Sequence, residues 1–126
     1  MRYVIAVNHP VYGSQGAFLA YQFAQALIKQ HHHIVQVFFF QAGVTNGNAY
    51  INPANDEFDL QKAWLNFSRQ YNIPLHLCIS AAQRRGVVDN QTARLLQHNN
   101  LAEGFVLAGL GEFTKAVLEA DRLITL

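Results

Sequence analysis

Cysteine and charge are both scarce in this sequence of 126 residues, and each scarcity excludes a class of protein. Cys78 is the only cysteine, so the chain cannot build an internal disulfide framework, and a lone thiol fits a reducing cytoplasm. Charged residues make up only 13% of the chain beside 51% hydrophobic residues, which argues against intrinsic disorder. A surface with so few charges favours contact with other protein chains.

The sequence also lacks the features that nucleic-acid binding or membrane insertion would need. The formal net charge is +1, and Arg84 and Arg85 are the only adjacent pair among nine Lys and Arg residues. That distribution leaves no electrostatic footprint for DNA or RNA. No apolar run approaches the roughly eighteen residues that span a bilayer, and Asn8-His9-Pro10 ends the first run too soon for a signal peptide. We therefore expect no direct nucleic-acid binding and no membrane association.

What is present is a regular alternation of strand-like and helix-like segments. Short apolar runs indicate five strands, over residues 3–7, 34–40, 75–79, 104–108 and 122–126. Apolar residues at helical spacing indicate helices after Ser14 and after Asp56, both of which are expected as N-caps, and another over residues 113–120. A weaker helical pattern extends from Asp89 through His98.

This alternation predicts an α/β fold, with residues 1–126 as a single domain. We expect a five-stranded, mostly parallel sheet with helices on both faces, in the flavodoxin-like strand order 2-1-3-4-5 that is common at this size. The first and third strands would then adjoin at the topological switch point, where ligands gather beyond the carboxyl ends of the strands. That order would bring His9 and Tyr12, in the loop 9–14, close to Cys78 and the segment 78–85.

Cys78 is the strongest candidate for chemistry because it is predicted at the carboxyl end of the third strand. If the segment that follows it begins a short helix, the free backbone N–H groups and the nearby Arg84 and Arg85 would favour the thiolate. The thiolate is the nucleophilic form of cysteine. The alternative is a buried structural cysteine, which is the commoner use of a lone cysteine.

Three other features are weaker candidates. The turn Gly13-Ser14-Gln15-Gly16 resembles a phosphate-binding turn but lacks the lysine and spacing of a Walker A loop. The run His31-His32-His33 cannot converge on one metal ion, because consecutive side chains point in different directions. Tyr50 and Ile51 have no periodic partner to pack against and are candidates for a subunit interface. We expect no bound cofactor and no metal.

Several segments taken together carry a family likeness over essentially the whole chain: residues 10–15, 37–40 followed by Gly43-Val44, 53–60, 81–87 and 107–111. In combination they resemble the DsrE/TusD sulfurtransferase family, most closely its TusD branch. The resemblance implies a DsrE-like fold and a cytoplasmic sulfurtransferase in which Cys78 accepts sulfur as a persulfide.

The resemblance also implies partners. TusB-like and TusC-like subunits would complete a heterohexamer, a TusA-like protein would donate sulfur, and a TusE-like protein would accept it for 2-thiolation of the wobble uridine of certain tRNAs. Three alternatives remain open: a DsrE-type subunit in sulfur oxidation, a flavodoxin-like small-ligand binding module with an inert Cys78, and a scaffold subunit whose own thiol never turns over.

Overall fold

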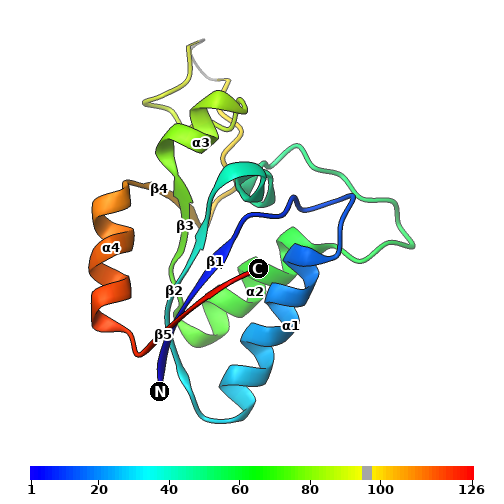
Figure 1. Ribbon diagram of the computed structural model, residues 1–126. Coiled ribbons are helices and arrows are strands. Elements are labelled where there is room, and N and C mark those ends of the chain that lie inside the picture. The colour runs from blue at the N-terminus through cyan, green and yellow to red at the C-terminus, as the bar shows by residue number, and fades with distance from the viewer. Residues whose placement is uncertain (95–97) are drawn as a thin grey trace.

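A computed structural model describes residues 1–94 and 98–126 (Figure 1). Five strands form one sheet with the order β4-β3-β2-β1-β5, and every adjacent pair is parallel. The strands are β1 (Arg2–Val7), β2 (His33–Phe39), β3 (Leu75–Cys78), β4 (Phe105–Ala108) and β5 (Arg122–Thr125). The predicted single-domain α/β fold with a five-stranded parallel sheet is confirmed.

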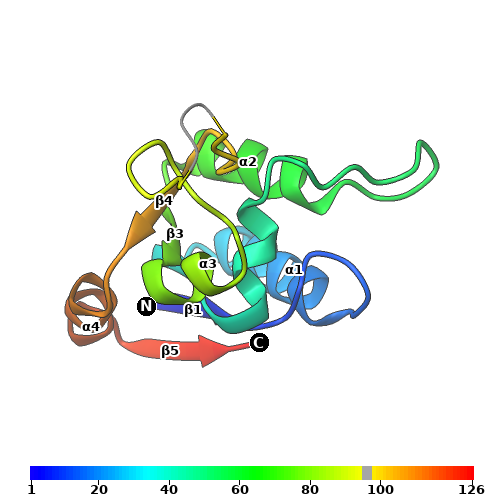
Figure 2. The ribbon, with the colours of Figure 1, turned by 90° about the horizontal axis from the view of Figure 1, so that it is seen from above.

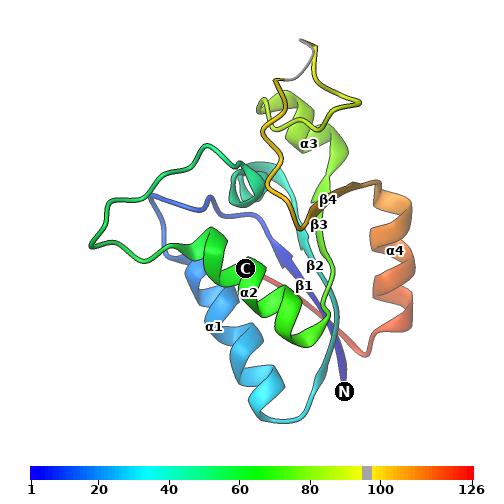
Figure 3. The same ribbon diagram turned by 180° about the vertical axis from the view of Figure 1, so that it is seen from behind.

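Helices cover both faces of the sheet, as expected. On one face lie α1 (Gly16–Lys29) and α2 (Leu60–Tyr71), and on the other lies α4 (Leu110–Glu119) (Figures 1 and 3). A 3-10 helix, η1 (Gln41–Gly47), follows β2, and the short helix α3 (Ile79–Arg84) follows β3. Both of these lie beyond the carboxyl ends of the strands (Figure 1).

The strand order 2-1-3-4-5 is wrong, because β3 pairs with β2 and not with β1. Burial explains the difference: β2 carries Phe38 and Phe39 on opposite faces and both are buried, which suits an interior strand better than an edge. The more exposed β5 occupies one edge instead. Two right-handed steps in one direction place α1 and α2 on the same face, and the reversal between β4 and β5 places α4 on the other.

Two helix starts also differ from the sequence-based expectation. Asp59, and not Asp56, caps α2, and its Oδ1 accepts a hydrogen bond from the backbone N–H of Lys62 at 3.0 Å. Gln15, and not Ser14, occupies the cap position of α1, without a side-chain hydrogen bond. Several residues in each connection have capping chemistry, so the local pattern does not select among them.

The helix expected from Asp89 to His98 does not form over residues 89–94 or at residue 98. Asp89 instead folds a turn, in which its Oδ1 accepts from the backbone N–H groups of Gln91 and Thr92. Such local side-chain bonds compete with helix formation. The remaining positions of that prediction, 95–97, lie outside the described residues.

The main hydrophobic core lies between the sheet and the helices α1 and α2. Trp64 of α2 is fully buried there, edge-on to Phe39 with ring centroids 5.4 Å apart. Leu75 and Leu77 of β3 belong to this core. Because side chains alternate along a strand, the half-buried His76 belongs to the opposite face of β3, whereas the half-buried Cys78 at the strand end packs against the core.

Candidate functional site at the carboxyl edge of the sheet

Cys78 is the last residue of β3, pairs in register with Ala108 of β4, and occupies the N-cap position of α3. Its thiol is free and half-buried, and the side chain makes no capping hydrogen bond. The predicted strand-end position and the short helix after it are both confirmed. A reactive thiol must be accessible, and partial exposure meets that requirement.

The two neighbouring arginines do different things. Arg85 turns back on α3, and its Nη1 donates a hydrogen bond to the carbonyl oxygen of Ala81 at 3.2 Å. That bond satisfies a carbonyl in the last turn of the helix. Arg84 is exposed on the same turn. Both side chains are exposed to solvent, and Arg85 differs from Arg84 in the hydrogen bond that holds it against α3.

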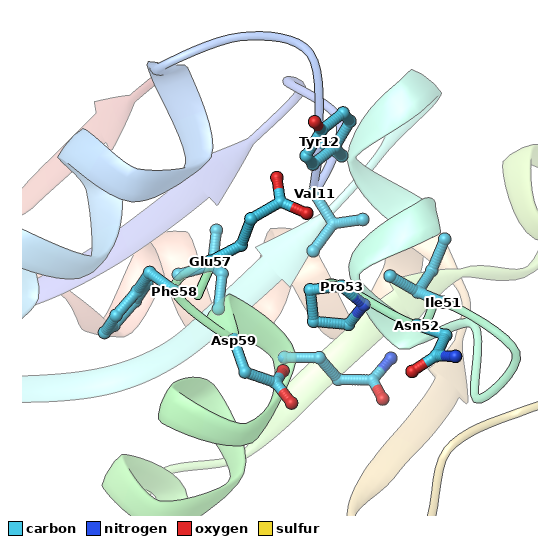
Figure 4. Close-up of a pocket in the computed structure, with 10 residues that line it drawn as sticks. Val11, Tyr12, Ile51, Asn52, Pro53, Glu57, Phe58 and Asp59 are labelled. Carbon is cyan, nitrogen blue, oxygen red and sulfur yellow. The ribbon is translucent and has the colours of Figure 1, made fainter. Parts of the chain in front are cut away.

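In the structure, η1 lies between the loop at residues 9–14 and α3, the helix that follows Cys78 (Figure 2). The backbone N–H of Val11 donates to Thr45 Oγ1 at 3.1 Å, and η1 on its other side contacts α3. Tyr12 lies beside the Glu57 carboxylate instead (Figure 4). The expectation that His9 and Tyr12 lie near Cys78 is wrong, since it followed from a strand order that placed β3 beside β1.

Buried polar bonds hold η1 in place. Gly43 passes so close to β1 that a Cβ added there would lie 2.1 Å from the carbonyl oxygen of Val7, so only glycine fits. Asn46 is fully buried, and its Nδ2 donates to the carbonyl oxygens of Gly43 at 2.8 Å and His9 at 3.2 Å. From α2, Gln61 Nε2 donates to the carbonyl oxygen of Asn46 at 2.9 Å. These contacts fix the position of η1, which in turn packs against α3.

Asn46 and Gln61 were not singled out from the sequence. The Asn-rich composition of the connection between β2 and α2 was the only available signal, and it did not distinguish Asn46 from the exposed or half-buried asparagines nearby. Gln61 Nε2 also donates to the carbonyl oxygen of Asn48 at 2.7 Å, and this bond holds the start of the loop that follows η1.

His76 was also missed, although it precedes Cys78 by two residues on β3. Its Nδ1 is buried and has no hydrogen-bond partner among the described residues. Burial lowers the pKa of His76 below its usual value, and the nearby Glu112 carboxylate opposes part of that shift. The imidazole is therefore held in its neutral form more strongly than a solvated histidine.

A pocket of about 250 Å³ lies where the loop at residues 48–59 returns to α2 (Figure 4). We name it the Glu57 pocket. Its lining residues are Val11, Tyr12, Ile51, Asn52, Pro53, Glu57, Phe58, Asp59, Leu60 and Gln61. Glu57 points toward Tyr12 across the pocket, and its Oε1 accepts from the backbone N–H of Ala54 at 2.9 Å. The Ala54 hydrogen bond lowers the pKa of Glu57, and the neighbouring Glu57 carboxylate raises the pKa of Tyr12.

The interface candidates Tyr50 and Ile51 lie beside this pocket. Ile51 lines it, and Tyr50 is 74% exposed on the same loop.

The run His31–His33 lies elsewhere, at the turn between α1 and β2, where His32 Nδ1 is 3.1 Å from the N-terminal amino group. Within residues 1–94 and 98–126, no three His, Cys, Asp or Glu side chains are grouped so as to hold a metal ion. Nor does that part of the chain contain a helix with the length and hydropathy of a membrane span.

Comparison with known proteins supplies the family. The model of the DsrE/DsrF-like family matches residues 1–126. A Haemophilus influenzae protein named sulfurtransferase TusD homolog is 68% identical over 126 residues, which cover 100% of both chains. A Proteus mirabilis protein named sulfurtransferase TusD is 48% identical over 98% of this chain and 97% of that one.

Solved structures agree with this assignment. The ychN protein of E. coli superimposes with a TM-score of 0.79 and 26% identity, over 99% of this chain and 98% of that chain. The MTH1491 protein of Methanobacterium thermoautotrophicum, with a TM-score of 0.68 and 12% identity, shares the fold. The sulfurtransferase prediction is confirmed by the relatives that match from end to end. The chain is a sulfurtransferase and belongs to the DsrE/DsrF-like family.

Proposed function

We propose that this chain is the persulfide-carrying subunit of a sulfur relay, with Cys78 as the carrier. The observation that carries the proposal is the position of the sole thiol, half-buried at the carboxyl end of β3 and at the cap of α3. Full-length relatives that are named sulfurtransferases supply the reaction class. A free cysteine is the one side chain of this protein that can hold sulfur as a persulfide.

The transfer needs no external oxidant or reductant. The Cys78 thiolate attacks the terminal sulfur of a donor persulfide, a new S–S bond forms, and the donor cysteine leaves as a thiolate. An acceptor thiolate then attacks the terminal sulfur on Cys78 and releases the Cys78 thiolate. Each step breaks one S–S bond and forms another, so the sulfur atom moves without a net redox change.

The donor in this proposal is a TusA-like protein, the acceptor is a TusE-like protein, and the relay serves 2-thiolation of the tRNA wobble uridine in the cytoplasm. TusB-like and TusC-like subunits complete the assembly. The exposure of several large apolar side chains supports such partners, because an isolated chain would leave them in water. Val106 and Leu110 belong to this exposed set, near the Cys78 end of β3 and β4.

The decisive experiment is an intact-protein mass spectrum after incubation with a cysteine desulfurase, cysteine and a TusA-like donor. The wild-type chain should gain the mass of one sulfur atom, and dithiothreitol should remove it. Cys78→Ser should gain nothing while keeping the wild-type circular dichroism spectrum. A wild-type chain that gains no sulfur, or a Cys78→Ser chain that gains as much, contradicts the proposal and leaves an inert thiol or a scaffold role.

A second measurement tests the direction of transfer. Loaded wild-type chain is mixed with a TusE-like protein, and both masses are followed with time. The extra sulfur should leave Cys78 and appear on the acceptor cysteine. Retention of the sulfur on Cys78 would contradict the relay step and would leave only sulfur acceptance.

A further inference from the structure

The Glu57 pocket has no part in the sulfur transfer described above, since η1 lies between α3, which follows Cys78, and the loop at residues 9–14, which carries Tyr12 (Figure 2). We propose that this pocket is a docking site for a partner protein, and that it takes a segment in which a lysine or arginine stands next to an apolar side chain. The inference does not depend on the role of Cys78.

The size and lining of the pocket suit a protein side chain. Its volume of about 250 Å³ lies below the roughly 300–1,000 Å³ of sites for small molecules and cofactors. Half of the lining residues are apolar: Val11, Ile51, Pro53, Phe58 and Leu60. A pocket of this kind fits one or two side chains of a partner segment, in the way that interface anchors fill small desolvated pockets.

The charge of the pocket selects a basic partner. Its charged lining residues are the carboxylates Glu57 and Asp59, and no lysine or arginine lines it. Nor does the sequence contain a lysine or arginine between Lys29 and Lys62. Asp59 Oδ1 caps α2 and Glu57 Oε1 accepts from the Ala54 backbone N–H, so each carboxylate keeps its second oxygen for a cation. Charge complementarity therefore assigns the occupant a positive charge.

Glu57 is also held in position before any partner arrives. Its Oε1 accepts from the Ala54 backbone N–H at 2.9 Å, and its carboxylate points toward Tyr12 (Figure 4). Hydrogen bonds to the charged form keep a carboxylate ionised. A carboxylate that is already oriented loses little conformational entropy on binding, which favours a specific contact with an ammonium or guanidinium group.

Exposed aromatic rings at the rim point to the same occupant. Tyr12 is 68% exposed and Phe58 is 57% exposed, and both line the pocket. Phe58 is fixed against α1 by an edge contact with Phe18, with ring centroids 5.2 Å apart. Aromatic rings attract cations through their faces, and exposed aromatic residues are enriched at protein interfaces. The projection of the loop at residues 48–59 away from the sheet leaves this rim accessible (Figure 2).

The test uses two dipeptide probes that differ in one charge, acetyl-leucyl-arginine amide and acetyl-leucyl-citrulline amide. Each is titrated into the full-length ¹⁵N-labelled chain, and the amide chemical shifts are followed. The arginine probe should shift the amides of Tyr12, Ile51 and Phe58, and the neutral citrulline probe should bind about ten-fold more weakly.

Glu57→Gln keeps the shape and one acceptor oxygen but removes the charge. In this variant the arginine probe should bind about as weakly as the citrulline probe, and binding of the citrulline probe should not change. Glu103→Gln is the matched control, because Glu103 is an exposed carboxylate outside the pocket and its loss should change neither probe.

Three results would overturn the proposal. The first is equal binding of the two probes, or no binding of either. The second is an arginine-probe affinity that Glu57→Gln leaves unchanged. The third is a shift of the same amides with protein concentration alone, which would assign the pocket to a second copy of this chain instead of a basic partner.

Discussion

The Phe113 ring of α4 stacks on the Phe38 ring of β2, with centroids 4.4 Å apart and planes inclined by 28°. Phe38 is buried on the sheet face opposite α1 and α2, and Phe113 is half-buried. Among the helices in the described part of the chain, α4 is the one that packs on this face (Figure 3). The ring pair is therefore the main aromatic contact that fastens α4 to the sheet.

Phe113→Ala should lower the free energy of unfolding by about 2 kcal/mol, because a half-buried ring loses roughly half of what a fully buried phenylalanine loses. Urea denaturation measures the change. Leu118→Ala on the same helix is the control, since Leu118 is 82% exposed and its loss should cost less than about 0.5 kcal/mol. Equal effects of the two variants would show that the ring stacking contributes nothing beyond exposed helix surface.

Asn46→Ala should lower the free energy of unfolding by about 2 kcal/mol, because it leaves the buried carbonyl oxygen of Gly43 and the partly buried one of His9 without this donor. The same denaturation assay measures it. Asn66→Ala, at an exposed position on α2, should change stability by less than about 0.5 kcal/mol. A wild-type stability for Asn46→Ala would mean that water replaces both bonds at no cost.

His76 should make the chain less stable as the pH falls below 6.5. Burial places the folded-state pKa of His76 below 6.5, so between these two values the unfolded chain binds a proton that the folded chain does not. Stability is lost as the pH falls through this window and levels off once folded His76 is also protonated. His76→Gln should reduce this slope in denaturation curves.

The titration of His76, followed by NMR of its ring protons, gives a second check on the same site. The midpoint should lie below 6.5, and Glu112→Gln should lower it further because the carboxylate raises the pKa of His76. A midpoint at or above 6.5 would contradict the burial argument. An unchanged midpoint in Glu112→Gln would contradict the proximity of the carboxylate.

Arg84 should accelerate attack of Cys78 on negatively charged disulfides. At a rise of about 1.5 Å per residue along the axis of α3, Arg84 lies about 9 Å from Cys78. This distance is within one Debye length at low salt. Arg84→Ala should slow the reaction with the dianionic dithiobis(nitrobenzoate) by about two- to four-fold, and with neutral dithiodipyridine much less. Equal slowing of both reagents would indicate a structural effect of the substitution instead of a charge effect.

Local periodicity was sufficient to predict the strands, the main helices and the strand-end position of Cys78. Each of these features depends on residues that are neighbours in sequence. An apolar run of about four to seven residues indicates a buried strand, and helical spacing places Trp64 and Phe67 on one face of a helix. Helix caps were less reliable, since Asp56 and Asp59 have the same side chain and only the path of the loop places Asp59 at the first turn of α2.

The sequence by itself determined that this chain is an α/β protein with one thiol at a strand end, because strand and helix periods are properties of the local backbone. Only the tertiary structure decided that β2 stands between β1 and β3, that η1 lies between the loop of Tyr12 and α3, and that Tyr12 meets Glu57. Strand order is settled by competition among whole-sheet packings, in which the strand with large side chains buried on both faces takes the interior position.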